Sequence, residues 1–326
     1  MSIVAVVAPS VNGFSIEEWL LLQPGWLSGL PTGQPDRLDL TLPKSPALQK
    51  VPGTLLRIAA RAACHWTDKA ESGTLCTMTT QTHPPFLLLS CYELGHQPVS
   101  LGWPLAALSA AGLAATAVDL SVDDFPTGAA SAARLVAIAA PMHTALRLGV
   151  EAARRVRALN PAAHITFFGL YAWLNGDYLL HSNGEAALAD SVIAGEYEGP
   201  LIALARALSD GRAAVDVVGV STPGRSAQPN LARLSFPVPE RASLPSLEKY
   251  ARYVADGESH LAGYVEASRG CLHTCRHCPV VPVYNGRFFI VPVETVLADI
   301  RQQVAAGARH ITFGDPDFLN GPGHYR

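Results

Sequence analysis

Short apolar runs alternate with helix-type segments between residues 85 and 208, and this alternation constrains the fold more than any other feature. The runs have strand length and cover residues 86–91, 115–120, 135–140, 165–168 and 191–194. Helical spacing marks residues 103–111, 145–159 and 200–208. Apolar strands without polar alternation are typical of a parallel sheet that helices cover on both faces. We therefore predict an α/β fold with a doubly wound, five-stranded parallel (Rossmann-like) domain over residues 84–210.

Proline and glycine recur in the segments on either side of this domain. Residues 1–83 show no persistent period, and we predict an N-terminal extension with one short helix over residues 54–65. Met78 directly precedes the regular pattern, so a translation start at Met78 and an accessory N-terminal arm both stay open. Residues 211–256 carry five prolines and are predicted as a semi-rigid linker.

The linker is predicted to contain a short strand over residues 215–220. After it, the pattern predicts a strand over residues 261–267, a helix over residues 294–306 and another strand over residues 310–313. We assign residues 257–326 to a second domain that begins with these elements.

The charge balance and the apolar stretches exclude several classes of partner. With 24 basic and 27 acidic residues the net charge is −3, which gives no electrostatic reason to expect a nucleic acid or an anionic membrane. The longest apolar stretch, residues 105–118, is shorter than the ~20 residues of a membrane-spanning helix. No basic region precedes the apolar N-terminus, so we predict no signal peptide and expect a cytoplasmic protein.

Three of the six cysteines lie within eight residues, as Cys271-Leu-His-Thr-Cys275-Arg-His-Cys278. Without an export signal, such crowding indicates a metal site rather than a disulfide framework. Three thiolates on one loop suit an iron–sulfur cluster, and a four-iron cluster would keep one iron open for a substrate or cofactor. A zinc site with His273 or His277 as fourth ligand, and a loop that holds no metal, remain as alternatives. Zinc sites usually have two ligand pairs, and no second pair occurs near this loop.

The C-x3-C-x2-C spacing directly after a predicted strand resembles the radical S-adenosylmethionine (radical SAM) superfamily. The resemblance implies that Cys271, Cys275 and Cys278 bind a [4Fe-4S] cluster, whose open iron takes the amine and carboxylate of SAM. Reductive cleavage of SAM then gives a 5′-deoxyadenosyl radical. In the family an aromatic residue usually precedes the third cysteine and packs near the adenine, and His277 has that position here.

The loop after the next predicted strand, Gly314-Asp315-Pro316-Asp317, has the place of the loop that contacts the SAM amine in this family. The resemblance implies that Gly314, Asp315 and Asp317 help to seat SAM, since an ammonium group needs carboxylate and carbonyl acceptors. A solvated turn around Pro316 is the alternative.

The order of domains over residues 84–326 resembles the cobalamin (B12)-dependent class of radical SAM enzymes. Ligands of doubly wound sheets lie over the C-terminal ends of the strands. The candidate residues for a cobalamin face at these ends are Met142, His143, Gly169, Gly195 and Glu196. The D-x-H-x-x-G motif, which places a histidine beneath cobalt in other B12 proteins, is absent, so we expect cobalt without such a ligand. A scaffold that binds nothing, or another ligand, is the alternative.

The resemblance implies a radical SAM enzyme that transfers a methyl group, or makes another radical modification, on a small-molecule or peptide substrate. A reductant such as flavodoxin or ferredoxin would be its partner. The catalytic domain of the family is a partial TIM-type barrel of about six βα units, and residues 257–326 supply only the first. We therefore expect a chain truncated early in the barrel or completed by a second chain.

No catalytic residue is assigned from the sequence. Two other functions stay open: a radical SAM protein whose upstream domain binds no cobalamin, and a non-catalytic, zinc-stabilised α/β binding module.

Overall fold

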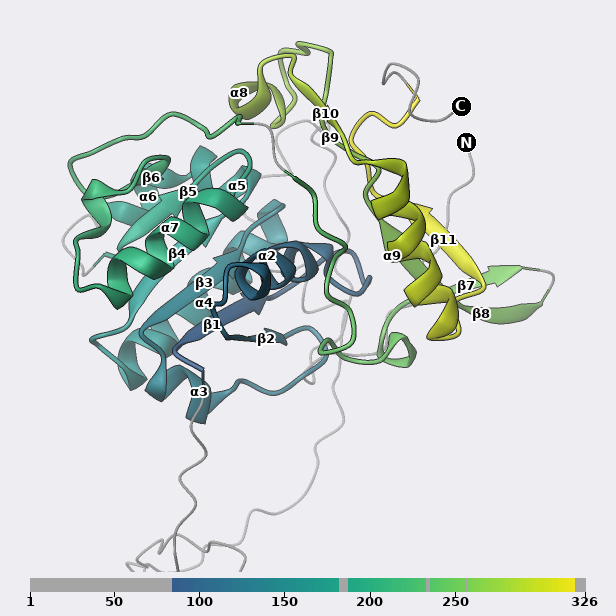
Figure 1. Cartoon of the computed structure of the whole chain (residues 1–326), viewed down its shortest axis with the longest axis horizontal. Coiled ribbons are helices and arrows are strands. Elements are labelled where there is room, and N and C mark those ends of the chain that lie inside the picture. The colour runs from purple at the N-terminus through teal and green to yellow at the C-terminus, as the bar shows by residue number, and fades with distance from the viewer. Residues whose placement is uncertain (1–83, 182–186, 233–234, 256, 320–326) are drawn as a thin grey trace, which may run out of the picture. The chain divides into compact units, whose positions relative to one another are not determined.

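The computed structural model describes residues 84–319, except residues 182–186, 233–234 and 256 (Figure 1). The predicted N-terminal extension, with its helix over residues 54–65, lies outside the described residues. Two groups of strands make up the described part: a larger sheet, and a smaller set that carries the cysteines.

Six strands form the larger sheet, in the order β2-β1-β3-β4-β5-β6. They are β1 (Phe86–Ser90), β2 (Ala115–Asp119), β3 (Leu135–Ala139), β4 (His164–Phe168), β5 (Ser191–Ile193) and β6 (Val220–Ser221). The first five are parallel, and β6 pairs antiparallel with β5. The order 2-1-3-4-5 of the parallel strands is that of flavodoxin-like doubly wound sheets.

Helices cover both faces of this sheet, because successive strand residues point to opposite sides and both sides are apolar (Figure 1). One face packs against α2 (Val99–Ala110) and α7 (Glu198–Ser209). The other packs against α3 (Thr127–Ala132), α4 (His143–Leu159), α5 (Leu170–Leu174) and α6 (Gly176–Leu180). The predicted α/β fold, with helices on both faces of a mainly parallel sheet, and all five predicted parallel strands are therefore found.

The sixth strand corrects the prediction of a five-stranded sheet. The apolar run that predicted a strand over residues 215–220 instead forms a 3-10 turn, η1 (Ala214–Asp216), before β6 begins at Val220. Gly219, with φ +80°, turns the chain between them, and Val217 and Val220 bury their side chains against the sheet. Of the run, only Val220 therefore pairs with β5, together with Ser221, which follows the run.

The segment predicted as a linker is packed along much of its length. Phe236, Leu244, Leu247 and Tyr250 are buried. η2 (Leu247–Lys249) and β7 (Arg252–Ala255) also lie in this segment. Its prolines favour extended backbone, but the apolar residues between them supply enough buried surface to dock the segment.

The smaller set of strands contains a βαβ unit. β8 (Glu258–Val265) pairs in parallel with β11 (His310–Phe313) and antiparallel with β7. Between β8 and β11 the chain forms β9 (Ser268–Gly270), α8 (Val281–Tyr284), β10 (Phe288–Ile290) and α9 (Val293–Ala305). The predicted strand over residues 310–313 is confirmed, and the helix predicted over residues 294–306 is shifted by one residue.

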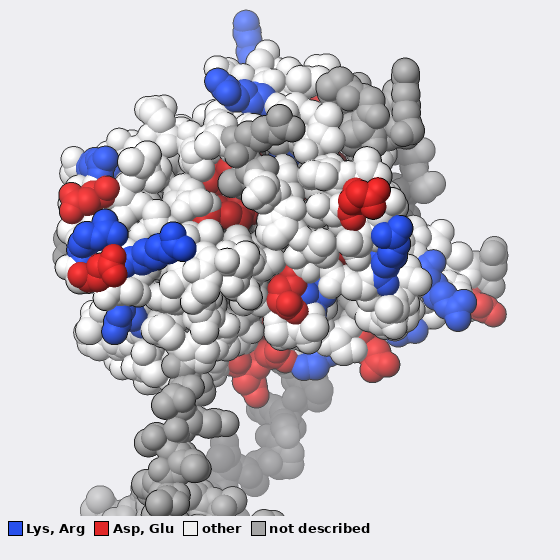
Figure 2. Space-filling model, in the orientation of Figure 1, with Lys and Arg blue, Asp and Glu red and all other residues white. Residues whose placement is uncertain are grey.

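The surface shows no segregation of charge on the face drawn in Figure 2, where basic and acidic side chains are interspersed. Among the described residues, no helix combines the length and the hydropathy needed to cross a bilayer.

Phe167 tests the packing of α4 on the sheet, because its fully buried ring lies against this helix at Gly149. We expect Phe167→Ala to lower the free energy of unfolding by about 3–5 kcal/mol, through lost burial and the cavity left behind. Leu148→Ala, at a half-exposed position on the same helix, is the control and should change it by less than ~1 kcal/mol. Urea denaturation followed by circular dichroism measures both, and equal losses would contradict this packing.

Candidate functional site

The cysteine loop, which we define as residues 271–287, is closed at its base by the β9–β10 pair. Gly270 lies opposite Phe288, and the backbone N–H of Cys271 donates to the carbonyl of Arg287 at 3.2 Å. Gly270 has φ +79°, and a Cβ there would overlap the Arg287 carbonyl. Glycine is therefore required immediately before the first cysteine so that the two strands can approach.

The three thiols of this loop differ in exposure. Cys275 is exposed, while Cys271 and Cys278 are half-buried against Val280, Val283 and other apolar neighbours. Among the described residues, no three metal-binding side chains are already gathered around one point. Three free thiols within eight residues are nevertheless the donor set of an iron–sulfur cluster, and metal sites commonly order when the metal binds. The residues present therefore fit a cluster by their donor chemistry.

The acidic loop after β11 lies directly beside the start of the cysteine loop. The Cys271 thiol donates to Asp317 Oδ2 at 3.1 Å, and the backbone N–H of Ala267 donates to Asp315 at 3.1 Å. The hydroxyl of Ser268 also donates to Asp315. Parallel pairing of β8 with β11 brings the two loops to the same edge. The alternative of a solvated turn does not describe Asp317, which is only 8% exposed.

Gly314 and His277, the other two residues predicted to seat SAM, lie in different surroundings. A Cβ at Gly314 would overlap the Tyr264 hydroxyl, so glycine permits close contact with this ring. Tyr264 in turn stacks on His96 of the larger sheet, with ring centroids 4.6 Å apart. His277 is exposed on the cysteine loop. No local sequence signal marks Tyr264, because its contact with His96 joins residues 168 positions apart.

Three of the residues predicted for a cobalamin face lie at neighbouring strand ends. Met142 and His143 follow β3, Gly169 follows β4, and His143 meets the ring of Tyr171 edge-on at 6.4 Å. His143 is exposed, and Met142 and Tyr171 are half-buried, so these ends present side-chain surface. Gly169 has φ +103° and lies close to the Ala140 carbonyl, which explains the glycine without a ligand.

The other two residues predicted for that face, Gly195 and Glu196 after β5, are covered. A Cβ on Gly195, which has φ +76°, would overlap the Asn230 carbonyl. The backbone N–H of Glu196 donates to the same carbonyl at 2.7 Å, and its side chain is 0% exposed. These residues therefore have internal partners where the prediction placed an open ligand surface.

Glu196 belongs to a buried cluster of charges around Arg269. Arg269 Nη1 donates to Glu196 Oε2 at 2.9 Å, and its Nε donates to Glu266 Oε2 at 3.4 Å. Arg269 Nη2 lies 2.7 Å from Glu198 Oε1, but off the N–H direction, so this contact is ionic. The Tyr284 hydroxyl donates to Glu196 Oε1 at 2.9 Å. No local sequence pattern predicts this cluster, because Arg269 and Tyr284 lie 73 and 88 positions from Glu196 along the chain.

Burial dominates the electrostatics of this region. Loss of solvation raises the pKa of Glu196 and of Glu266, although the Arg269 charge opposes the rise at both. Burial also raises the pKa of Glu93 to about 8. The Glu93 carboxylate lies after β1 and accepts the backbone N–H groups of Val99 and Ser100 at the start of α2.

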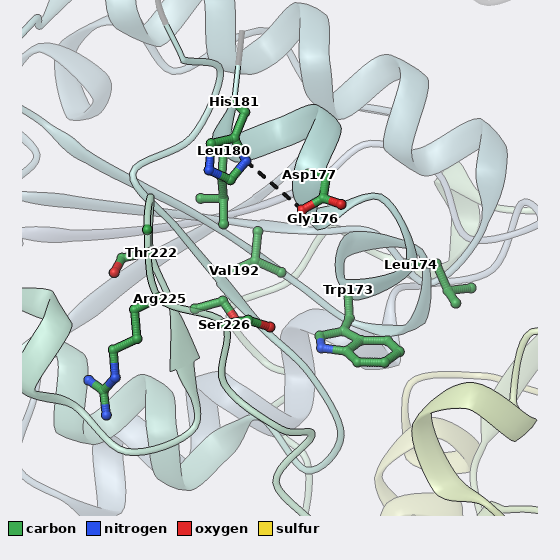
Figure 3. A pocket seen from close by; sticks show the side chains of 12 residues that line it. Trp173, Leu174, Gly176, Asp177, Leu180, His181, Val192, Thr222, Arg225 and Ser226 are labelled. Atoms are coloured by element: carbon green, nitrogen blue, oxygen red, sulfur yellow. Dashed lines mark ion pairs between the residues drawn. The ribbon is translucent and has the colours of Figure 1, made fainter.

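A cavity of about 410 Å³ lies beside α5, α6 and β6 (Figure 3). His181 and Asp177 face each other across 3.9 Å in its wall, and Arg225 lies on another side. None of the residues predicted for a site lines it. The candidate site is therefore formed by the cysteine loop, the acidic loop after β11 and the strand ends of the larger sheet.

Comparison with known proteins shows the same fold in a radical SAM methyltransferase. No protein-family model matches the chain. The structure of TsrM from Kitasatospora setae with tryptophan substrate and the SAM analogue aza-SAM matches with a TM-score of 0.58 at 18% identity, over 74% of this chain and 49% of that one. TsrM with cobalamin and a [4Fe-4S] cluster matches with a TM-score of 0.57 at 19% identity, over 74% and 51%. What these matches establish is a shared fold, over about half of the length of TsrM.

A substitution at Gly195 tests whether this glycine is required for internal packing or for contact with a ligand. Gly195→Ala forces a side chain into a left-handed backbone position against the Asn230 carbonyl, so we expect a loss of about 1–3 kcal/mol in unfolding free energy without any ligand. Gly199→Ala, in α7 with open space around it, is the control and should be neutral or stabilising. Chemical denaturation of both variants checks this, and an unchanged stability of Gly195→Ala would favour a ligand role.

Proposed function

We propose that this chain forms the α/β domain and the cluster-binding start of a cobalamin-dependent radical SAM enzyme, with methyl transfer as the reaction. The observation that carries the proposal is the contact between the cysteine loop and the acidic loop after β11, through Cys271 and Asp317. This contact brings the Cys271 thiol to the acidic loop, at the edge where β8 and β11 pair in parallel. The shared fold with TsrM supports the same reading.

Cys271, Cys275 and Cys278 would hold the [4Fe-4S] cluster, and the acidic loop would bind the amine of SAM. When bound, the cluster supplies the electron for reductive cleavage of SAM. Asp315 is already engaged by Ala267 and Ser268, so it fixes the loop, and Asp317 is the carboxylate nearest the thiols. An ammonium group would gain charge-assisted hydrogen bonds there.

The strand ends of β3 and β4 would receive the cobalamin. The exposed His143, together with Met142 and Tyr171, gives the apolar and aromatic surface that a large planar ligand needs. Glu196 is not part of this surface, since its carboxylate is buried on Arg269 and Tyr284. We further propose a small-molecule or peptide substrate and a flavodoxin or ferredoxin as reductant.

Iron binding tests the cluster assignment. Anaerobic reconstitution with iron and sulfide should give a brown protein with a visible charge-transfer band, and Cys275→Ala should abolish it because two thiolates remain for four irons. Cys91→Ala is the matched control, since Cys91 is buried in the core of the larger sheet and should leave iron binding unchanged. Stoichiometric zinc without bound iron in the parent chain would favour the zinc-stabilised module instead.

Hydroxocobalamin binding tests the strand ends. Equilibrium dialysis should show binding, and Tyr171→Ala should weaken it by about fivefold to tenfold, as expected for the loss of one aromatic contact worth about 1 kcal/mol. Tyr178→Ala, at an exposed position on α6, is the control. The EPR spectrum of the reduced complex should lack splitting from a histidine nitrogen. Absence of binding would favour a radical SAM protein whose upstream domain is only a scaffold.

A further inference from the structure

Both ends of the cysteine loop meet on a single carboxylate of the larger sheet. Arg269 lies two residues before Cys271 and reaches Glu196 Oε2 at 2.9 Å. Tyr284 lies six residues after Cys278 and donates its hydroxyl to Glu196 Oε1 at 2.9 Å. The two oxygens of one side chain therefore hold the segments that enter and leave the three thiols.

The Glu196 carboxylate is itself fixed in place. Its residue follows β5, and its backbone exchanges two hydrogen bonds with Asn230: the N–H donates to the Asn230 carbonyl at 2.7 Å, and its carbonyl accepts from Asn230 Nδ2 at 2.6 Å. The side chain has no exposed surface. A carboxylate so constrained can set the position of what binds to it, because it loses little further freedom.

Arg269 is held equally firmly. Its guanidinium group lies over the rings of Trp103, Tyr197 and Phe236, at 5.1, 5.2 and 5.3 Å from their centroids. Arginine stays charged in such surroundings and presents its donors in a fixed plane, so each nitrogen can face a different partner. Water is largely excluded, which strengthens the pairing with Glu196.

We propose that Glu196 is a positioning residue that joins the two ends of the cysteine loop to the end of β5, and so sets where the three thiols lie relative to the larger sheet. The clamp is the trio Glu196, Arg269 and Tyr284. The inference rests on the proposed function only for the identity of the group that the loop holds. It assigns to Glu196 a role in the geometry of the thiol site.

Hydrogen exchange of the metal-free full chain tests the clamp directly. Glu196→Gln should speed amide exchange within residues 271–287 by about tenfold or more, because Arg269 loses its ion pair with Glu196 and the Tyr284 hydroxyl loses its charged acceptor. Asp299→Asn is the matched control: Asp299 is also a buried carboxylate paired with an arginine, Arg241 at 2.9 Å, but it lies on α9. It should change exchange in the cysteine loop by less than about twofold.

Tyr284→Phe keeps the ion pair and removes one hydrogen bond, so it serves if Glu196→Gln does not fold. It should raise exchange in the cysteine loop by about twofold to fivefold, with most of the effect at the end of the loop after Cys278. Unchanged exchange in the folded variants, or an equal rise in Asp299→Asn, would overturn the clamp.

Iron retention separates this inference from the proposed function. After reconstitution, Glu196→Gln should lose iron to a chelator about tenfold faster than the parent chain, while Asp299→Asn should match the parent. Equal rates for the parent and Glu196→Gln would contradict a role of the clamp in holding the thiols. If the parent chain takes up no iron, the proposed function fails, and the exchange measurement still decides whether Glu196 anchors the loop.

Discussion

The pairing of Glu196 with Arg269 is the contact on which the position of the cysteine loop depends. Three carboxylates, on Glu196, Glu198 and Glu266, surround this one guanidinium group, and burial raises the pKa of Glu196 and Glu266. A buried excess of acidic groups is costly unless each finds a donor or a proton. The Tyr284 hydroxyl supplies one such donor, to Glu196, and the aromatic rings around Arg269 stabilise its positive charge. The cysteine loop is therefore held on the larger sheet by an ion pair, a hydrogen bond and cation–π contacts.

A second buried arginine, Arg241, docks the proline-rich segment (residues 211–256) on other parts of the chain. Arg241 donates to both carboxylate oxygens of Asp299 on α9, to the carbonyl of Tyr264 on β8, and to the carbonyl of Gln97 from the larger sheet. It thus contacts three parts of the chain at once. The proline-rich segment is therefore docked on the βαβ unit through Arg241 and Asp299, at a point separate from the cysteine loop.

The elements with strong periodicity could be predicted from the sequence, and the weak ones could not. The five parallel strands and α9 follow from short apolar runs that alternate with segments of helical spacing. β6, β9 and β10 have two or three residues and lie outside the alternation of strands and helices, and they exist because a neighbouring strand supplies hydrogen bonds. The same reason explains why residues 215–220 gave a turn and a short strand.

The candidate site could also be predicted only in part from the sequence. Cysteine spacing marked the thiols, and the strands predicted on either side of them bring Asp317 to Cys271 and Asp315 to Ala267. Glu196 was selected as a strand-end residue, which it is, but its partners come from residues far along the chain. No local signal encodes such an ion pair, because it arises only when the two strand systems pack together.

The central claim is that the cysteine loop and the acidic loop together form a cluster site that binds SAM. EPR spectroscopy of the reconstituted, reduced full chain, recorded with and without SAM, tests it most directly. We expect a [4Fe-4S] signal whose g values shift when SAM is added, because one iron would be open to it. A cluster signal that SAM leaves unchanged, or a chain that takes up zinc and no iron, would contradict the claim.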